Sequence, residues 1–69
     1  MEIIRDCAGR IVCKGDAGTG FIEIRYRDLI IHATLVMGET YVIEREGIVT
    51  TVTRTGDFHF SVSSRIAAA

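Results

Sequence analysis

The sequence predicts an all-β fold, an antiparallel meander of about six strands that forms a small barrel or a curled sheet. Seven glycines and no proline punctuate the chain, and the runs between them are rich in Ile, Val, Thr, Tyr and Phe. These residue types fit a pleated, half-buried surface, and a helical period of 3.6 fits none of the runs well. At 69 residues the chain has room for one domain with a thin core, predicted over residues 1–63, followed by a tail at 64–69.

The first turn is predicted at residues 6–9, Asp-Cys-Ala-Gly. Asp is favoured at the first position of a type I turn, and Gly takes the left-handed conformation of a G1 bulge, which pairs Asp6 with Arg10. Counting outward predicts four further pairs: Arg5 with Ile11, Ile4 with Val12, Ile3 with Cys13, and Glu2 with Lys14. Opposite charges then face each other across the hairpin.

The glycine-rich stretch CKGDAGTG at residues 13–20 raises the question of a phosphate-binding loop. Such a loop needs a helix N-terminus behind its glycines, and the Walker pattern needs a Lys and a hydroxyl after the last glycine. Here Lys14 precedes the glycines, and Phe21 begins an alternating run, FIEIRYR, that is typical of a strand. The stretch is therefore predicted to be a hairpin loop.

A chain reversal at Arg27 and Asp28 predicts a second hairpin, because it produces one continuous apolar face. That face contains Ile22, Ile24 and Tyr26 from one strand and Leu29, Ile31 and Ala33 from the next. No glycine marks this turn, so one long bent strand is the alternative. The match between the two faces favours the hairpin.

Three further strands are predicted after residues 37–39, separated by a bulged type I turn at residues 44–47 and a tight turn at residues 55–56. The predicted pairs are Ile43 with Val49, Tyr41 with Thr51, Arg54 with Asp57, Thr53 with Phe58, and Thr51 with Phe60. The predicted apolar face holds Tyr41, Ile43, Val49, Phe58, Phe60 and Val62, and the polar face includes Thr50, Arg54 and His59. The tail, SSRIAAA, is predicted to be frayed, with at most one helical turn.

The charge balance disfavours nucleic acid and anionic membranes as partners. The chain has eight Lys and Arg and nine Asp and Glu, and the basic residues are scattered from Arg5 to Arg65. Both kinds of partner need a concentrated positive patch. No apolar run approaches the roughly 20 residues that span a bilayer, and the N-terminus has no apolar stretch for a signal peptide. Cys7 and Cys13 are predicted to be reduced thiols, so a cytoplasmic location is expected.

Four side chains are candidate binding residues: Arg25, His32, Arg54 and His59. His32 is predicted opposite Glu23, which could orient a general base, but an ordinary cross-strand polar pair is favoured because no Ser or Cys nucleophile lies beside it. His59 could contact a ligand, but a solvated polar residue is the favoured interpretation. No catalytic residue and no cofactor is predicted. A metal site within one chain is not predicted either, because the two Cys and two His are far apart in the sequence, and a site shared between subunits is the alternative.

Aromatic and basic residues interleave at residues 24–28, IRYRD, a pattern that can stack single-stranded nucleic acid. Strand alternation places Tyr26 on the face opposite Arg25 and Arg27. The rings and charges are therefore predicted not to share a surface, and a solvated face is favoured.

Two resemblances extend this interpretation. Residues 6–24 resemble the start of short proteins of bacterial phages and integrative elements, which implies a mobile-element origin and a cytoplasmic setting and transfers no activity. The matching residues are Asp6, Gly9, Arg10, Val12, Cys13, Lys14, Asp16, Thr19, Gly20, Ile22, Glu23 and Ile24. Residues 38–56 resemble the trp RNA-binding attenuation protein family of ring-forming all-β subunits. Thr53 and Thr55 flank a single Arg54 where that family has basic residues for RNA, so this resemblance implies strand pairing between subunits without RNA binding.

The sequence therefore predicts a non-catalytic interaction module that forms a homo-oligomer, with a protein partner as a further possibility. Exposed sheet edges in so short a chain invite pairing between subunits. The alternative is an oligomeric protein that binds a small ligand or nucleotide between subunits, with the four candidate residues as its contacts.

Overall fold

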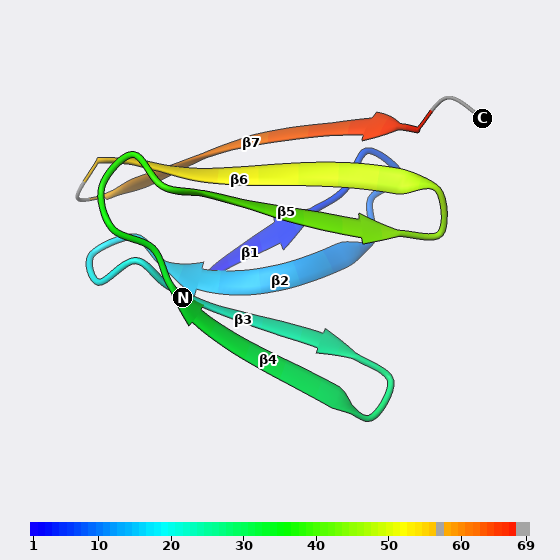
Figure 1. Ribbon diagram of the computed structural model, residues 1–69, viewed down its shortest axis with the longest axis horizontal. Coiled ribbons are helices and arrows are strands. Elements are labelled where there is room, and N and C mark those ends of the chain that lie inside the picture. Colours follow the sequence, from blue (N-terminus) through cyan, green and yellow to red (C-terminus); the bar gives the residue numbers. More distant parts are fainter. Residues whose placement is uncertain (57, 68–69) are drawn as a thin grey trace.

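In a computed structural model that describes residues 1–56 and 58–67, the chain forms two antiparallel sheets of consecutive strands (Figure 1). The first sheet has the order β1-β2-β3-β4 and the second β5-β6-β7. The strands are β1 (Glu2–Arg5), β2 (Ile11–Asp16), β3 (Phe21–Tyr26), β4 (Leu29–Thr34), β5 (Thr40–Arg45), β6 (Ile48–Gly56) and β7 (His59–Ile66). The all-β antiparallel meander is confirmed. The described strands form two open sheets and not a closed barrel.

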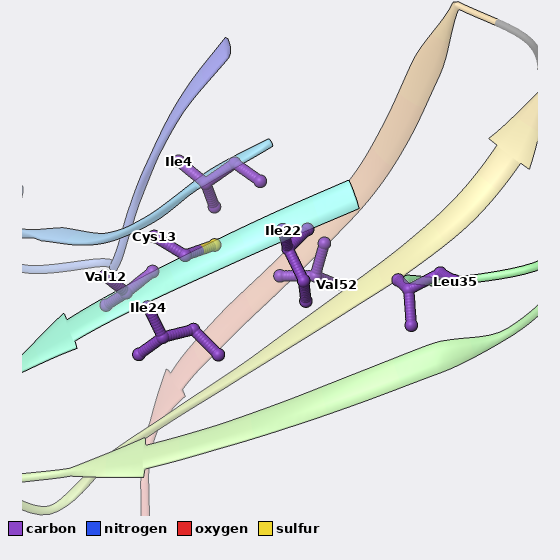
Figure 2. Close-up of a cluster of buried hydrophobic side chains, with 7 residues drawn as sticks. All are labelled: Ile4, Val12, Cys13, Ile22, Ile24, Leu35 and Val52. Atoms are coloured by element: carbon purple, nitrogen blue, oxygen red, sulfur yellow. The ribbon is translucent and has the colours of Figure 1, made fainter. Parts of the chain in front are cut away.

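The two sheets pack on each other through a hydrophobic core, most of which comes from the first sheet (Figure 2). Its buried members are Ile4, Val12, Cys13, Ile22, Ile24, Leu35 and Val52. Val52 comes from β6 and is fully buried, and Leu35 comes from the segment that crosses between the sheets. Full burial of one such aliphatic side chain stabilises a fold by about 1.5–3 kcal/mol. These two residues therefore join the second sheet to the first.

The β3–β4 hairpin has the predicted register. Its pairs include Ile22 with Ala33, Glu23 with His32, Ile24 with Ile31, and Tyr26 with Leu29. Arg27 has a φ of 57°, in the left-handed region, so the chain reverses over Arg27 and Asp28 without a glycine. The hairpin is confirmed, and the long bent strand is wrong.

The turn between β1 and β2 forms as predicted. The N–H of Asp6 donates to the carbonyl of Arg10 at 2.9 Å, and the N–H of Gly9, with φ 83°, donates to the carbonyl of Asp6 at 2.9 Å. Beyond the turn, Arg5 faces Ile11 as predicted, but Ile4 faces Cys13, Ile3 faces Lys14, and Glu2 faces Gly15 in place of Lys14. Val12 is the extra residue of a β-bulge, which allows Val12 and Cys13 to be buried together.

Residues 17–20 form the hairpin loop between β2 and β3, which confirms the prediction for the glycine-rich stretch. The carbonyl of Asp16 accepts from the N–H of Gly20 at 2.7 Å, and its carboxylate accepts from the N–H of Gly18 at 2.9 Å. Gly20 has a φ of 83°, and a Cβ atom at this position would overlap the carbonyl oxygen of Leu35. Glycine is therefore required where the loop meets the crossing segment.

The register of the second sheet differs from the predicted one, and the difference exchanges the two faces of β6. Tyr41, Ile43 and Phe60 pack against the core, as predicted. Glu46 and Gly47 both have positive φ, 53° and 77°, so the turn has two residues and no bulge. The pairs are Arg45 with Ile48, Ile43 with Thr50 in place of Val49, and Tyr41 with Val52 in place of Thr51. Because side chains alternate along a strand, this shift turns Thr50 and Val52 into the core and Val49 away from it.

β7 pairs with almost the whole of β6, so the tight turn predicted at residues 55–56 is wrong. Gly56 faces His59, Arg54 faces Phe60, Thr53 faces Ser61, Thr51 faces Ser63 and Val52 faces Val62, and Phe58, predicted to lie on the apolar face, is exposed. The pair predicted for Asp57 lies outside the described residues. β7 continues to Ile66, into the predicted tail, and the hydroxyl of Ser64 lies 3.0 Å from that of Thr50. Residues 64–66 are therefore strand and not a helical turn.

Candidate functional site

Two of the four predicted binding residues, Arg25 and His32, meet on the outer face of the first sheet, where each contacts Glu23. Oε1 of Glu23 lies 3.1 Å from Nε2 of His32, and Oε2 lies 3.3 Å from Nε of Arg25. The register of β3 and β4 positions this group, because it places Glu23 opposite His32. The ring centroid of Phe21 lies 5.2 Å from that of His32 and flanks the histidine.

The two partners hold Glu23 as a carboxylate. Its hydrogen bond with His32 lowers the pKa of Glu23 and the charge of Arg25 adds to this effect, while partial burial acts in the opposite direction. The side chain of His32 is 57% exposed, so water reaches the pair from an open sheet face. A hollow of about 210 Å³ beside the pair is lined by Ile11, Val12, Cys13, Lys14, Glu23 and Arg25. Glu23 thus forms an ion pair with Arg25 along β3 and a solvated hydrogen bond with His32 across to β4.

Arg54 lies apart from this group, and its guanidinium is bonded to backbone carbonyls of two other segments. Nε donates to Ala17 at 3.1 Å, Nη2 to Gly18 at 3.0 Å, and Nη1 to Leu35 at 3.0 Å. A planar, charged group with several donors is suited to such a set of acceptors. Arg54 therefore ties the loop at residues 17–20 and the crossing segment to β6, which is a structural role.

His59 is exposed at the start of β7, on the second sheet. Its backbone carbonyl accepts a hydrogen bond from the Thr55 hydroxyl at 3.3 Å. The predicted set is thus divided, since Arg25 and His32 come together while Arg54 and His59 each lie elsewhere.

A cationic cluster that the sequence interpretation missed surrounds Tyr26, the last residue of β3. The guanidinium carbon of Arg27 lies 5.3 Å from the centroid of the Tyr26 ring, and that of Arg45 lies 4.9 Å from it. Both distances fall within the roughly 6 Å range of a cation–π interaction. The prediction that Tyr26 and Arg27 do not share a surface is therefore wrong.

The alternation of side chains along a single strand does not predict this cluster. Arg27 is in the turn, where its positive φ breaks the alternation that applies within β3. Arg45 is the last residue of β5 in the other sheet, and the β3–β4 and β5–β6 turns lie toward the same end of the molecule (Figure 1). Only the packing of the two sheets brings Arg45 to Tyr26.

Two hollows adjoin at Tyr26 and Arg45. The first, which we term the intersheet groove, has a volume of about 290 Å³ and is lined by Ile24, Tyr26, Leu29, Ile31, Ile43, Glu44 and Arg45. The second, which we term the arginine hollow, also has a volume of about 290 Å³ and is lined by Arg25, Tyr26, Arg27, Arg45 and Glu46. The apolar intersheet groove therefore lies beside the cationic arginine hollow.

Contacts between turns hold Arg45 in place. Its Nη2 donates to the carbonyl of Ile11 at 3.3 Å. Beside it, Arg10 forms ion pairs with the buried Asp6, at 3.5 Å, and with Glu46. These contacts join the β1–β2 turn of the first sheet to the β5–β6 turn of the second.

No protein-family model, curated protein or solved structure matches the chain. The resemblances to mobile-element proteins and to the ring-forming RNA-binding family therefore stay predictions. Across residues 1–56 and 58–67, no group of three or more His, Cys, Asp and Glu side chains is arranged to hold a metal ion. The same residues contain no helix with the length and hydrophobicity needed to cross a membrane.

Proposed function

We propose that this protein is a non-catalytic interaction module that pairs with a second copy of itself through the edge of β4. Over the described residues, β4 pairs only with β3. Its six residues include no proline and no Lys, Arg, Asp or Glu, and Leu29 and Ile30 are 58% and 52% exposed. Natural sheets use charges and prolines to block pairing at an edge. The open, apolar edge of β4 carries the proposal.

The other edge strands are better protected than β4. β1 has Glu2 and Arg5 at its two ends, and β5 ends in Glu44 and Arg45. β7 carries Arg65 close to its end. Each of these charges would lose water if another strand were added, which disfavours pairing there.

Matching of the two faces selects a register for the second copy. An antiparallel pair centred on Ile31 sets Leu29 against Ala33 of the second copy, and Ile30 against His32 of the second copy. The inward side chains of both copies then form one continuous apolar surface, whereas a shift of one residue would set inward positions against outward ones. A two-fold axis relates the copies and closes the interface.

Two features support binding over catalysis. His32 lies on an open sheet face, and the carboxylate that would orient it is already paired with Arg25. Burial, together with the charge of Glu2, raises the pKa of the Cys13 thiol to about 11. This thiol stays protonated at neutral pH, and a protonated thiol is a poor nucleophile.

Light scattering across a dilution series tests the proposal. We expect twice the chain mass of 7.6 kDa for the natural protein, and the mass of a single chain for Ile30→Lys, because the new charge would face His32 of the second copy. Val42→Lys is the matched control, since Val42 is equally exposed but lies on β5. A natural protein that is monomeric throughout, or an Ile30→Lys variant that still dimerises, would contradict pairing at β4.

A further inference from the structure

Two guanidiniums of the arginine hollow lie against one aromatic ring without a carboxylate partner. Among the described residues, ion pairs engage Arg10 and Arg25, whereas Arg27 and Arg45 form none. Both nevertheless lie close to the Tyr26 ring. Like charges held near one another repel, and an anion bound by both would remove that repulsion.

Apolar side chains continue from this ring into the intersheet groove. Ile24 and Ile31 of the first sheet and Ile43 of the second line it, and Leu29 leaves more than half of its surface in contact with water. Ligand pockets have volumes of roughly 300–1,000 Å³. The volume of the groove, about 290 Å³, is at the lower limit of this range, which suits a small ligand.

We propose that the intersheet groove and the arginine hollow together bind a small amphipathic carboxylate, with its alkyl body in the groove and its oxyanion bound by Arg27 and Arg45. A guanidinium binds a carboxylate through parallel N–H···O bonds. Glu44 lines the groove and Glu46 lines the hollow. Their negative charge disfavours a dianionic phosphate relative to a monoanionic carboxylate. The site shares Leu29 and Ile31 with the inward face of β4, but a single chain supplies all of its lining residues, so it does not depend on pairing between copies.

Calorimetric titration of the full chain with octanoate, below the concentration at which it aggregates, tests both parts of the ligand. Acetate keeps the charge without the body, and 1-octanol keeps the body without the charge. We expect each to bind at least about tenfold more weakly than octanoate, because one loses buried methylene groups and the other loses charged hydrogen bonds. Equal binding of octanol and octanoate would overturn the role of the arginines. Tighter binding of octyl phosphate would overturn the choice of a carboxylate.

Variants of the two arginines test the location of the site. Arg27→Gln and Arg45→Gln are each expected to weaken octanoate binding about tenfold, with little effect on octanol. Arg65→Gln, on exposed β7, is the control and should bind octanoate as the natural protein does. Arg45 also donates to Ile11, so a thermal melt by circular dichroism checks that its variant folds, and Arg27 in the exposed turn provides the independent test. Unchanged octanoate affinity in both variants would overturn the proposal.

The Ile30→Lys variant distinguishes a failure of the ligand proposal from a failure of the dimer proposal. Ile30 lies on the outer face of the first sheet and is not among the residues that line the groove. Ile30→Lys is therefore expected to bind octanoate with the affinity of the natural protein, whatever its mass in solution. A loss of octanoate binding in this variant would show that the site requires the second copy, which would overturn its assignment to a single chain.

Discussion

Nη1 of Arg54 donates to the carbonyl oxygen of Leu35 at 3.0 Å, a bond that links β6 of the second sheet to the segment that crosses between the sheets. The other bonded nitrogens of the same guanidinium donate to Ala17 and Gly18 in the β2–β3 loop. One side chain therefore joins three segments that are distant in the sequence. This arrangement makes Arg54 a determinant of stability more than of binding.

Replacement of Arg54 by Met is expected to lower the free energy of unfolding by about 3 kcal/mol. Hydrogen bonds from a charged group contribute roughly 1.5–3 kcal/mol, and the carbonyl groups would lose their partner. Arg54→Lys should recover only part of this loss, because a single ammonium cannot reach three carbonyls. Urea denaturation measures both, with exposed Arg65→Met as a control within about 0.5 kcal/mol of the natural protein. A loss below about 1 kcal/mol for Arg54→Met would contradict the structural role.

Gly20 and Gly9 form a matched pair, since both have a φ of 83° but only Gly20 lies against other backbone. Gly9→Ala should cost about 1–2 kcal/mol, the usual penalty of a left-handed alanine. Gly20→Ala adds overlap with the Leu35 carbonyl, so we expect it to cost at least about 2 kcal/mol more. Thermal denaturation of the two variants measures the difference. Equal losses would indicate that the loop at residues 17–20 moves away from the crossing segment at little cost.

The sequence predicted the fold correctly where its turn residues and apolar faces are compatible with only one turn geometry. The Asp6 and Gly9 pair specifies the first turn, and the match of apolar faces specifies the β3–β4 hairpin even without a glycine. The turn before β6 was ambiguous, because Glu46 followed by Gly47 fits a two-residue turn as well as a bulged one. The structure has positive φ at both residues, and that single difference moved every predicted β5–β6 pair by one position.

Val52 and Val49 test the corrected register directly. Val52 is fully buried against the first sheet, whereas Val49 is turned away from the core. We expect Val52→Ala to lower the free energy of unfolding by about 2–3 kcal/mol through lost burial and a cavity, and Val49→Ala to cost less than about 1 kcal/mol. Urea denaturation of the two variants ranks them. The reverse order would restore the register that the sequence predicted.

The parts of the candidate site that could not be predicted are those made by packing between sheets. The Glu23 and His32 pair follows from one hairpin and was predicted correctly. The approach of Arg45 to Tyr26 joins the ends of two strands in different sheets, and no pattern within either strand contains it. The same holds for Arg54, whose partners lie in two other segments. From the sequence alone, such charged side chains are interpreted as solvated, because the sequence does not show how the two sheets pack together.

The carboxylate of Asp6 is buried within the β1–β2 turn, beside Arg10. Its Oδ1 accepts from the backbone N–H groups of Ala8 at 2.9 Å and Arg10 at 3.0 Å, and its Oδ2 lies 3.5 Å from Nε of Arg10. Burial acts to raise the pKa of Asp6, but these hydrogen bonds and the charges of Arg10 and Arg45 outweigh it. The pKa therefore lies below its ordinary value of 3.8.

This lowered pKa predicts a pH-dependent contribution to stability. Because the pKa of Asp6 is lower in the folded chain, the unfolded chain binds a proton at Asp6 more readily as the solution is acidified. The free energy of unfolding therefore decreases as the pH decreases. The contribution is complete above about pH 5 and is lost as the pH falls through 3.8 toward the folded-state pKa. Asp6→Asn, which keeps an acceptor oxygen, should be less stable than the natural protein at neutral pH, with a difference that shrinks on acidification. Urea midpoints measured in steps from neutral to acidic pH give this difference, and a value that does not change with pH would show that the charge of Asp6 contributes nothing.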